Sequence, residues 1–368
     1  MPRRSEPSVD RTPAAVGTAR HVVIVGAGFG GLACAQALAG SEVRVTVIDR
    51  RNHHLFQPLL YQVATAALSP ADIANPVRSI LAGAVNIDVV MGEVCAIERA
   101  ERRVLLADGG HVPFDTLVLA TGSAYNYFGH DEWARHAPGL KSIRDARSLR
   151  ARLLRSFEEV ESGAVHGRRT ALLTTVIVGG GPTGVEMAGA VAELVRFTLR
   201  RDFRRIDTHE ARIILVEAGT RLLAAFSPEA SDYAAASLRR LGVEVRLGAK
   251  VTDVTAGAVT IDGTRIEAAT LIWAAGIRAL EPSLLGFEVD RAGRIEVAED
   301  LSVPGLAGIF ALGDAASFRE DGRPLPALAQ VARQQGTHLG QALLAGTARP
   351  FRYASRGDTA VIGRHAAV

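Results

Sequence analysis

Three glycines in one turn carry the first chemical signal in this sequence. Gly26, Gly28 and Gly31 follow a run of β-branched apolar residues. That run, Val22–Val25, predicts a buried strand, and Leu32–Ala39 predicts a helix. In this spacing the first glycine permits a tight turn, the second lets a pyrophosphate approach the backbone, and the third lets helix and strand pack closely. The helix N-terminus then offers free N–H groups to the phosphates. A plain glycine-rich surface turn is the alternative.

An acidic residue stands where the ribose of such a nucleotide would lie. The apolar stretch Val43–Ile48 predicts a second strand, and Asp49 follows it directly. A carboxylate at this point accepts hydrogen bonds from the hydroxyl groups of an adenosine ribose. Strand, glycine turn, helix and acid together predict a dinucleotide-binding unit.

The same pattern occurs a second time in the chain. The strand and turn VIVGGGPTG repeat the glycine spacing at Gly179, Gly181 and Gly184. Glu217 ends the strand predicted for Arg212–Val216 and takes the place of the first acid. The segment TLVLATGS, which contains Gly122, returns as TLIWAAG, which ends at Gly276, and the offsets of the two repeated landmarks differ by one residue. An internal repeat of this kind predicts an α/β fold with two Rossmann-like dinucleotide-binding domains.

A last landmark predicts how the two domains are connected. Gly308–Ala316 has the sequence GIFALGDAA, an apolar strand followed by Gly313, Asp314 and a small-residue helix start. We expect this segment to return to the first domain, which makes that domain discontinuous, with the second inserted in it. The predicted domains are a flexible leader at 1–19, a first domain at 20–150 and 290–345, a second domain at 151–289, and a C-terminal region at 346–368.

The stretches between these landmarks predict smaller elements. Apolar residues at helical intervals in Asp145–Val160 predict an amphipathic connecting helix. Residues 84–113 and 243–266 predict short strands joined by glycine turns, such as Asp108-Gly109-Gly110. The arginine-rich segment Arg196–Arg205 extends a helix or forms a surface excursion.

Composition restricts the class of protein. The chain has 368 residues, of which 48% are hydrophobic and 22% charged, enough for two ordinary domains with their own cores. The net charge is only +3 and no long block of like charges occurs, which argues against a nucleic-acid partner. No apolar run is long enough to span a membrane. Mild basicity fits both an anionic membrane surface and a cytosolic enzyme.

The two cysteines, Cys34 and Cys95, are far apart in the sequence and form no CxxC or CxxxxC pair. A dithiol redox relay within the chain is therefore excluded, and a reducing compartment is expected. His53 and His54 lack metal-ligand spacing with any Cys or carboxylate cluster, so we predict no metal.

Beyond the repeat, the sequence resembles the FAD flavoproteins with two dinucleotide-binding domains, the pyridine nucleotide-disulfide reductase-like group. Finer motifs resemble the type II (alternative) NADH:quinone oxidoreductases, over the region from about residue 20 to the end of the chain. These motifs are His54–Ala64 (HLFQPLLYQVA), Ala74–Arg78 (ANPVR), Asn126–Gly129 (NYFG), Gly179–Gly189 (GGGPTGVEMAG) and Leu325–Gly336 (LPALAQVARQQG).

The resemblance implies FAD in the first domain and NADH in the second. Asp314 would bind the ribityl chain of FAD, with its helix start facing the flavin or pyrophosphate, and Asp49 the adenosine ribose. Glu217 favours NADH, because a carboxylate repels a 2′-phosphate, although Arg221 offers a binding partner for one. The residues implied for FAD are Gly26, Ala27, Gly28, Phe29, Gly30, Gly31, Asp49, Arg50, Val94, Ala120, Thr121, Gly122, Gly313, Asp314, Ala329 and Gln330. Those implied for NADH are Gly179, Gly181, Pro182, Thr183, Gly184, Glu186, Glu217, Ala275 and Gly276.

The implied activity is hydride transfer from NADH to FAD and transfer of two electrons to a membrane quinone, ubiquinone or menaquinone, without proton pumping. Glu186 would lie near the nicotinamide and flavin, and Gln330 and Gln334 would share one helix face near the quinone. The alternatives are an intrahelical salt bridge for Glu186 and a plain polar helix surface for the glutamines. The apolar run Phe56–Ala67 forms either an opposing wall of that site or core packing.

Two other functions stay open on the residues alone. One is a soluble NAD(P)H-dependent reductase for a ferredoxin- or rubredoxin-like protein, and the other is a non-catalytic redox-sensing flavoprotein. The resemblance implies a respiratory enzyme located in the cytoplasm, peripheral on the inner face of the cell membrane, and is compatible with a homodimer. Relatives continue beyond the IGxxxA-like segment Val361–Ala366 into membrane-binding amphipathic helices, whereas this sequence stops at Val368. We expect either a truncated sequence or a variant without the anchor.

Overall fold

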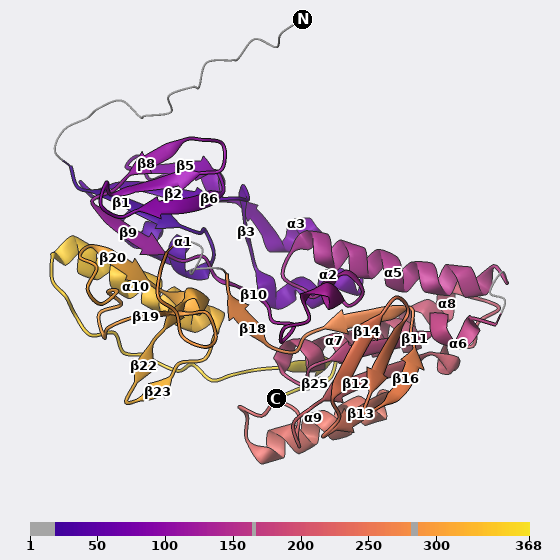
Figure 1. Ribbon diagram of the computed structural model, residues 1–368. Coiled ribbons are helices and arrows are strands. Elements are labelled where there is room, and N and C mark those ends of the chain that lie inside the picture. Colours follow the sequence, from indigo (N-terminus) through magenta and orange to yellow (C-terminus); the bar gives the residue numbers. More distant parts are fainter. Residues whose placement is uncertain (1–18, 164–166, 281–285) are drawn as a thin grey trace, which may run out of the picture. The chain divides into compact units, whose positions relative to one another are not determined.

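The computed structural model describes residues 19–163, 167–280 and 286–368 (Figure 1). The leader predicted at 1–19 therefore falls, apart from residue 19, outside the described residues. The chain divides into two compact units, each made of segments that are distant in sequence. The first contains the chain up to His54, Asn75–Ala124 and Arg278–Ala354; the second contains Leu55–Ala74, Tyr125–Ile277 and Ser355–Val368. The domain bounds predicted from the sequence stay a prediction.

The first unit is built on a five-stranded parallel sheet. Its strand order is β20-β9-β1-β2-β5. β20 joins the edge of this sheet only after the chain has passed through the second unit, which confirms that one dinucleotide-binding domain is inserted in the other. The strands are β1 (His21–Val25), β2 (Arg44–Asp49), β5 (Ile87–Met91), β9 (Thr116–Leu119) and β20 (Ile309–Ala311).

The second unit repeats the plan with a four-stranded parallel sheet in the order β13-β12-β11-β17. Here β11 takes the place of β1, and β17 the place of β9. The predicted duplication of a Rossmann-like α/β fold is therefore confirmed. The strands are β11 (Thr174–Val178), β12 (Arg212–Glu217), β13 (Val243–Leu247) and β17 (Thr270–Trp273).

The apolar runs of the central strands are explained by burial on both faces of each sheet. Val22 and Ile24 of β1 point into one core cluster, and Val23 and Val25 point into another. Successive side chains of a strand face opposite ways, so a strand between two cores has no solvent-facing position. In β11, Ile177 faces one core and its two neighbours in sequence face the other.

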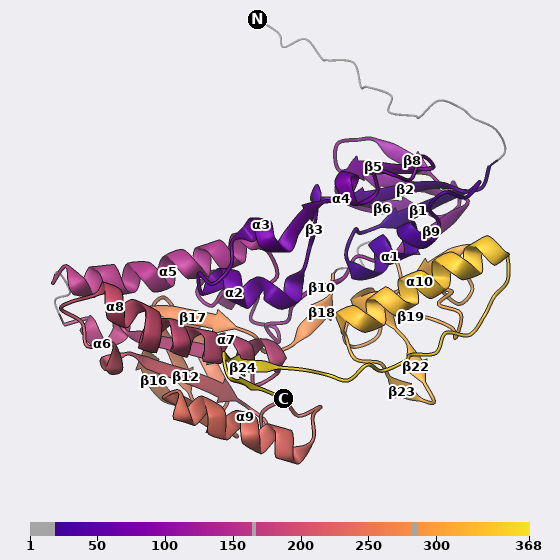
Figure 2. The same ribbon diagram turned by 180° about the vertical axis from the view of Figure 1, so that it is seen from behind.

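Helices cover these sheets in both units (Figures 1 and 2). α1 (Phe29–Ala37) follows β1, and α10 (Ala329–Ala345) packs against it. α7 (Pro182–Glu193) follows β11, and α9 (Pro228–Arg240) packs on β13. The predicted connecting helix is α5 (Ile143–Glu161), whose N-cap Ser142 accepts a hydrogen bond from the Asp145 N–H.

Each unit also contains a three-stranded antiparallel sheet in the stretch predicted to hold short strands. The first consists of β6 (Val94–Glu98), β7 (Arg103–Leu106) and β8 (His111–Pro113). The second consists of β14 (Val251–Thr255), β15 (Ala258–Ile261) and β16 (Thr264–Glu267). The predicted turn at Asp108-Gly109-Gly110 joins β7 to β8.

The remaining described elements are short. They are β3 (His53–Leu55), η1 (Gln57–Leu59), α2 (Leu60–Ala64), α3 (Pro70–Ile73), β4 (Ala74–Pro76), α4 (Val77–Ile80), β10 (Ser123–Tyr125), η2 (Asp131–Arg135), α6 (Arg169–Leu172), η3 (Leu194–Leu199), α8 (Arg200–Asp202), η4 (Thr208–Glu210), β18 (Ile277–Ala279), β19 (Ile295–Glu296), η6 (Gly313–Ala315), β21 (Ala316–Ser317), β22 (Arg319–Glu320), β23 (Arg323–Pro324), β24 (Val361–Gly363) and β25 (Ala366–Ala367).

The structure differs from the prediction at the first helix and at Asp314, and it selects one of the two forms predicted for the arginine-rich segment. The first helix begins at Phe29 rather than Leu32, because packing tolerates two glycines in its first turn despite their low helix propensity. The helix start predicted after Asp314 is wrong: η6 is a single 3₁₀ turn, and the chain then extends because Ala316 pairs with Ile295. The arginine-rich segment extends α7 as a π-helical turn, η3, followed by α8.

Candidate functional site

The first glycine turn has the geometry that the spacing predicts. Gly26 has a φ of +105°, and a Cβ there would lie 2.3 Å from the carbonyl oxygen of Ala120. A Cβ on Gly31 would lie 1.9 Å from the carbonyl oxygen of Gly26. By contrast, apart from its neighbours along the chain, no described residue comes within 4 Å of the position of a Cβ on Gly28. Two glycines therefore permit backbone contacts, and the third leaves an open place beside the helix N-terminus.

Asp49 closes this turn through the backbone. One of its carboxylate oxygens accepts the N–H of Ala27 and the other accepts the N–H of Arg51, both at 2.8 Å. A carboxylate has about four acceptor positions, so each oxygen can still accept a ribose hydroxyl. The acid is thus fixed at the rim of the turn.

The second turn reproduces the first. Gly179 has a φ of +111°, and a Cβ on Gly184 would lie 1.8 Å from its carbonyl oxygen. Beside Gly181, apart from its neighbours along the chain, no described residue comes within 4 Å of the position of a Cβ. Glu217 accepts the N–H groups of Gly180 and Gly219, each at 2.6 Å. Glu217 therefore accepts backbone N–H groups of the second turn as Asp49 does in the first.

Arg221 is the cation nearest in sequence to Glu217. Its Nη2 donates to the carbonyl oxygen of Ala224 at 2.6 Å. This contact uses part of the guanidinium that the sequence offered as a binding partner for a 2′-phosphate.

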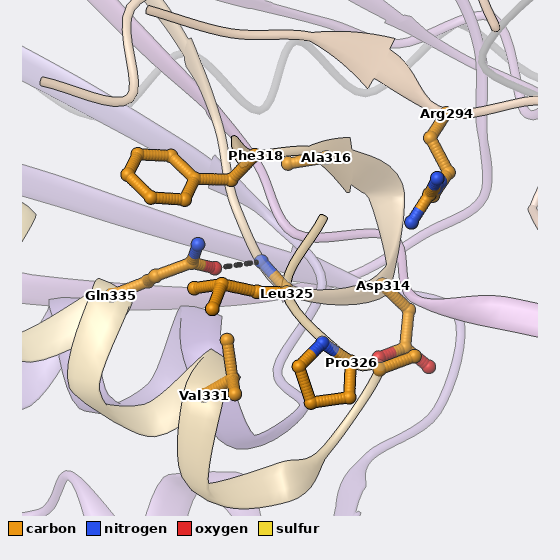
Figure 3. A pocket seen from close by; sticks show the side chains of 10 residues that line it. Arg294, Asp314, Ala316, Phe318, Leu325, Pro326, Val331 and Gln335 are labelled. Atoms are coloured by element: carbon orange, nitrogen blue, oxygen red, sulfur yellow. Dashed lines mark hydrogen bonds between the residues drawn. The ribbon is translucent and has the colours of Figure 1, made fainter. Parts of the chain in front are cut away.

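Asp314 lies at a pocket of the first unit, at the turn that follows β20 (Figure 3). Ser123 donates its hydroxyl to Asp314 Oδ2 at 2.5 Å. The backbone N–H of Gly313 donates to Gln335 Oε1 at 2.7 Å, and Gln335 on α10 is only 1% exposed. Arg294 lines the same pocket. The turn that carries Asp314 is therefore held by a strand end and by a buried amide.

Gln335 is a site residue that the sequence reasoning missed. It shares a helix face with Val331 and Leu339, both of which are buried. Val331, Gln335 and Leu339 are spaced four residues apart, which predicts one buried helix face. A glutamine on such a face requires a buried hydrogen-bond partner, so the spacing indicates a structural role for Gln335.

The glutamines that the sequence singled out lie elsewhere on α10. Gln334 pairs twice with the backbone of Ala354, donating to its oxygen at 2.9 Å and accepting its N–H at 3.0 Å. Gln330 is half-buried in the first turn, next to Ala329. Their roles toward a quinone stay a prediction.

Glu186 is half-buried in the first part of α7. Burial raises the pKa of this carboxyl group to about 7, although the N–H of Val361, at 3.4 Å, partly opposes the shift. The charge of Glu186 also helps raise the pKa of Tyr61 on α2, where burial is the larger cause. A carboxyl group that titrates near neutral pH can both donate and accept a hydrogen bond.

The other predicted residues lie near these turns or at strand ends. A Cβ on Gly30 would meet the Leu312 side chain at 2.3 Å, so the start of α1 touches the end of β20. Phe29 packs edge-to-face on His54, whose Nδ1 lies 3.0 Å from the Ala27 oxygen. Gly122 and Gly276, at equivalent strand ends, have φ values of +77° and +82°. Arg50 is exposed, Val94, Thr121, Thr183 and Ala275 are half-buried, and Pro182 is exposed at the first turn of α7.

Comparison with known proteins assigns the family. The sequence model of the pyridine nucleotide-disulphide oxidoreductases matches residues 20–336. The chain is 43% identical to the type II NADH:quinone oxidoreductase Ndh of Mycobacterium tuberculosis, over 98% of this chain and 82% of that protein. The chain belongs to the type II NADH:quinone oxidoreductases. NdhA of the same organism is 42% identical, over 97% of this chain and 80% of that protein.

The fold agrees with this family. The structure of NDH2 from Plasmodium falciparum in complex with NADH has a TM-score of 0.85 to this chain at 20% identity, covering 95% of this chain and 89% of that one. The predicted family and fold class are therefore confirmed.

Neither cysteine offers a thiol relay in this oxidoreductase. Cys34 is buried in α1, and burial raises the pKa of its thiol to about 12, which keeps it protonated. Cys95 is exposed on β6. In the described part of the chain, no group of three or more His, Cys, Asp or Glu residues could hold a metal ion. No helix among the described residues is long and apolar enough to cross a bilayer.

Proposed function

We propose that this chain is an FAD-dependent NADH:quinone oxidoreductase, a non-proton-pumping respiratory NADH dehydrogenase. The observation that carries the proposal is the duplicated glycine turn, each copy closed by its own acid, in a chain of this family that has no cysteine pair. The two turns provide for two dinucleotides, and the two cysteines form no CxxC or CxxxxC pair that could relay electrons to the final acceptor.

The first turn fits FAD. The open place beside Gly28 admits a pyrophosphate against the N-terminus of α1, and Asp49 accepts from the adenosine ribose. Asp314, held by Ser123, receives the ribityl chain. The further residues assigned to this cofactor are Gly26, Ala27, Phe29, Gly30, Gly31, Arg50, Val94, Ala120, Thr121, Gly122, Gly313, Ala329 and Gln330.

The second turn fits NADH. Gly181 leaves open space at the N-terminus of α7, where Pro182, Thr183 and Gly184 follow. Glu217 accepts from a free 2′-hydroxyl and repels a 2′-phosphate, which favours NADH over NADPH. Ala275 and Gly276 complete the assigned residues at the end of β17, together with Glu186.

FAD, when bound, supplies hydride acceptance from nicotinamide and transfer of two electrons to a quinone. The residues of the chain contribute binding, orientation and proton control. Glu186, whose pKa is about 7, holds or releases a proton at its carboxyl oxygen near the nicotinamide. Gln330 and Gln334 offer amide groups to a quinone carbonyl, and we assign ubiquinone or menaquinone as the class of acceptor.

We further propose a cytoplasmic enzyme that lies peripherally on the inner face of the cell membrane, where its quinone is dissolved. Binding to the membrane surface requires the C-terminal region, and a homodimer is compatible with this arrangement. Residues 20–150 with 290–345 would hold FAD, and residues 151–289 would hold NADH.

One anaerobic experiment tests the function. The purified protein should be yellow, lose its flavin colour on addition of NADH, and regain it on addition of a short-chain quinone. A colourless protein, or a flavin that NADH does not bleach, would contradict the proposal. Salt-dependent transfer to a ferredoxin-like protein with little quinone activity would favour the alternative reductase.

Nucleotide choice has its own test. Replacing Glu217→Ser and adding an arginine nearby should shift preference from NADH toward NADPH, because repulsion of the 2′-phosphate is removed. Unchanged preference would refute the ribose assignment without affecting the FAD site.

A further inference from the structure

The segment 359–368 forms a hairpin that belongs to the second unit (Figure 2). Ala360 and Val368 exchange both backbone hydrogen bonds, at 2.9 and 3.0 Å. Ala360 and Ile362 are fully buried. This segment includes the IGxxxA-like motif of the sequence, which the proposed chemistry does not use.

The hairpin lies directly on the backbone of α7. A Cβ on Gly189 would lie 1.8 Å from the carbonyl oxygen of Ile362, so only glycine allows β24 to approach the helix this closely. Gly189 follows Glu186 by three positions and precedes Glu193 by four, so the three residues share one face of α7.

Glu193 holds one end of β24. Its Oε1 accepts the backbone N–H of Arg364 at 2.6 Å, and its Oε2 lies 3.9 Å from the guanidinium of the same residue. The Glu193 side chain is 17% exposed, whereas that of Arg364 is 66% exposed. A Cβ on Gly363 would lie 2.9 Å from Glu193 Oε1. The carboxylate therefore binds the strand mainly through its backbone.

The other end of β24 lies over Glu186, which accepts the N–H of Val361 at 3.4 Å. Three elements that pack together here, α2, α7 and the hairpin, carry ionisable side chains close to Glu186 or Glu193. Tyr61 lies on α2. Burial is the largest cause that raises the pKa of its hydroxyl, a hydrogen bond with Gln62 lowers it, and the charges of Glu186 and Glu193 raise it further. Glu193 lies on α7 itself, and Arg364 follows β24.

We propose that Gly189 and Glu193 are positioning residues that hold β24 over Glu186 and so keep the carboxyl group at the NADH site shielded from water. The proposal rests on the proposed role of Glu186 near the nicotinamide. It gives the C-terminal hairpin a task in the reaction with NADH, in addition to its packing.

The test compares three variants of the FAD-loaded protein. Glu193→Ala removes the acceptor of the Arg364 N–H, Glu193→Gln keeps an acceptor oxygen, and Glu159→Ala removes an exposed glutamate on α5 as a matched control. Hydrogen exchange of the amides in 361–364 should become about tenfold faster in Glu193→Ala, because losing one charge-assisted hydrogen bond destabilises the closed state by about 1.4 kcal/mol. It should change little in the other two variants.

The second readout is the pH profile of anaerobic flavin reduction by NADH. In the unaltered protein the profile should report a group of pKa about 7. Glu193→Ala should lower this apparent pKa toward 4.5, because water then reaches Glu186. Glu193→Gln should keep the profile of the unaltered protein, because its amide oxygen still accepts the Arg364 N–H.

The outcomes separate the two levels of the proposal. Unchanged exchange in 361–364 in Glu193→Ala would overturn the positioning role, and Gly189→Ala, which displaces β24 by steric contact, gives an independent check on it. Faster exchange with an unchanged pH profile would overturn the shielding role. If Glu186→Gln itself leaves the profile unchanged, the proposed role of Glu186 fails, and the shielding role fails with it.

Discussion

The two nucleotide-binding copies share one turn but differ in what covers the helix behind it. In the first unit α10 packs on α1, and a Cβ on Gly336 would lie 2.1 Å from the Gly30 oxygen. In the second unit a strand, β24, takes that place on α7 at Gly189. Both covers use glycine to reach backbone contact, but one is a helix and the other an extended strand.

The difference teaches what each part of the duplicated fold controls. Each turn must fit the pyrophosphate group of its own dinucleotide, so the glycines and the acid are equivalent in the two units. The element that packs on the helix, α10 in the first unit and β24 in the second, binds no ligand that the two units share, so it can differ between them. α1, FGGLACAQA, has no carboxylate, whereas α7 carries Glu186 and Glu193. The second copy therefore combines binding with a titratable group.

The largest expected effect separates the two turns. Gly31→Ala and Gly184→Ala each place a methyl group within 1.9 Å of a carbonyl oxygen. The first should yield protein without flavin, and the second a flavoprotein whose NADH affinity falls about 100-fold, roughly 2.7 kcal/mol. Visible absorbance and NADH titration measure the two effects. Gly83→Ala, with open space around it, is the control, and flavin loss in both variants would contradict the separate assignment.

The two acids should show a smaller but parallel effect. Asp49→Ala should weaken FAD binding and Glu217→Ala should weaken NADH binding, each about tenfold or more, because the turn loses an acceptor for its N–H groups and the ribose loses its partner. Fluorescence titration of each nucleotide measures the dissociation constants. A Glu217→Ala variant with normal NADH binding would show that the acids are not equivalent.

Substitutions of buried Gln335 and half-buried Gln334, neighbours on α10, should have different effects. Gln335→Leu leaves the Gly313 N–H without its partner and should weaken FAD binding about tenfold. Gln334→Leu, whose contacts are with Ala354, should leave FAD affinity unchanged and lower turnover with quinone. Equal FAD affinities in the two variants would refute the role of Gln335 in holding the Asp314 turn.

The last prediction concerns stability and pH rather than binding. Since the pKa of Glu186 is raised from 4.5 to about 7 in the folded protein, its contribution to stability is present below pH 4.5 and is lost as pH rises through 7. Glu186→Gln should therefore gain stability relative to the unaltered protein between these values, by about 1 to 3 kcal/mol at pH 8. Urea unfolding at pH 5 and pH 8 measures the difference. A pH-independent difference would contradict the shift.

Both glycine turns were predictable because their constraints are local in sequence and general in geometry. A positive φ at Gly26 and the contact of Gly31 with its carbonyl oxygen require glycine whatever surrounds them. The arginine-rich insertion and the turn at Asp314 were less predictable. The sequence allowed two forms for the first, and the pairing of Ala316 with Ile295 replaced the expected helix in the second.

The sequence by itself determined the duplication, the two acids, the family and the lack of a thiol pair, because each follows from residue type and spacing along one chain. Only the tertiary structure decided that Gln335 rather than Gln334 binds the Asp314 turn, and that β24 lies on Glu186. These facts depend on which surfaces are buried against each other. Burial raises the energetic importance of a single hydrogen bond or carboxyl group, and no local pattern records the partner that buries it.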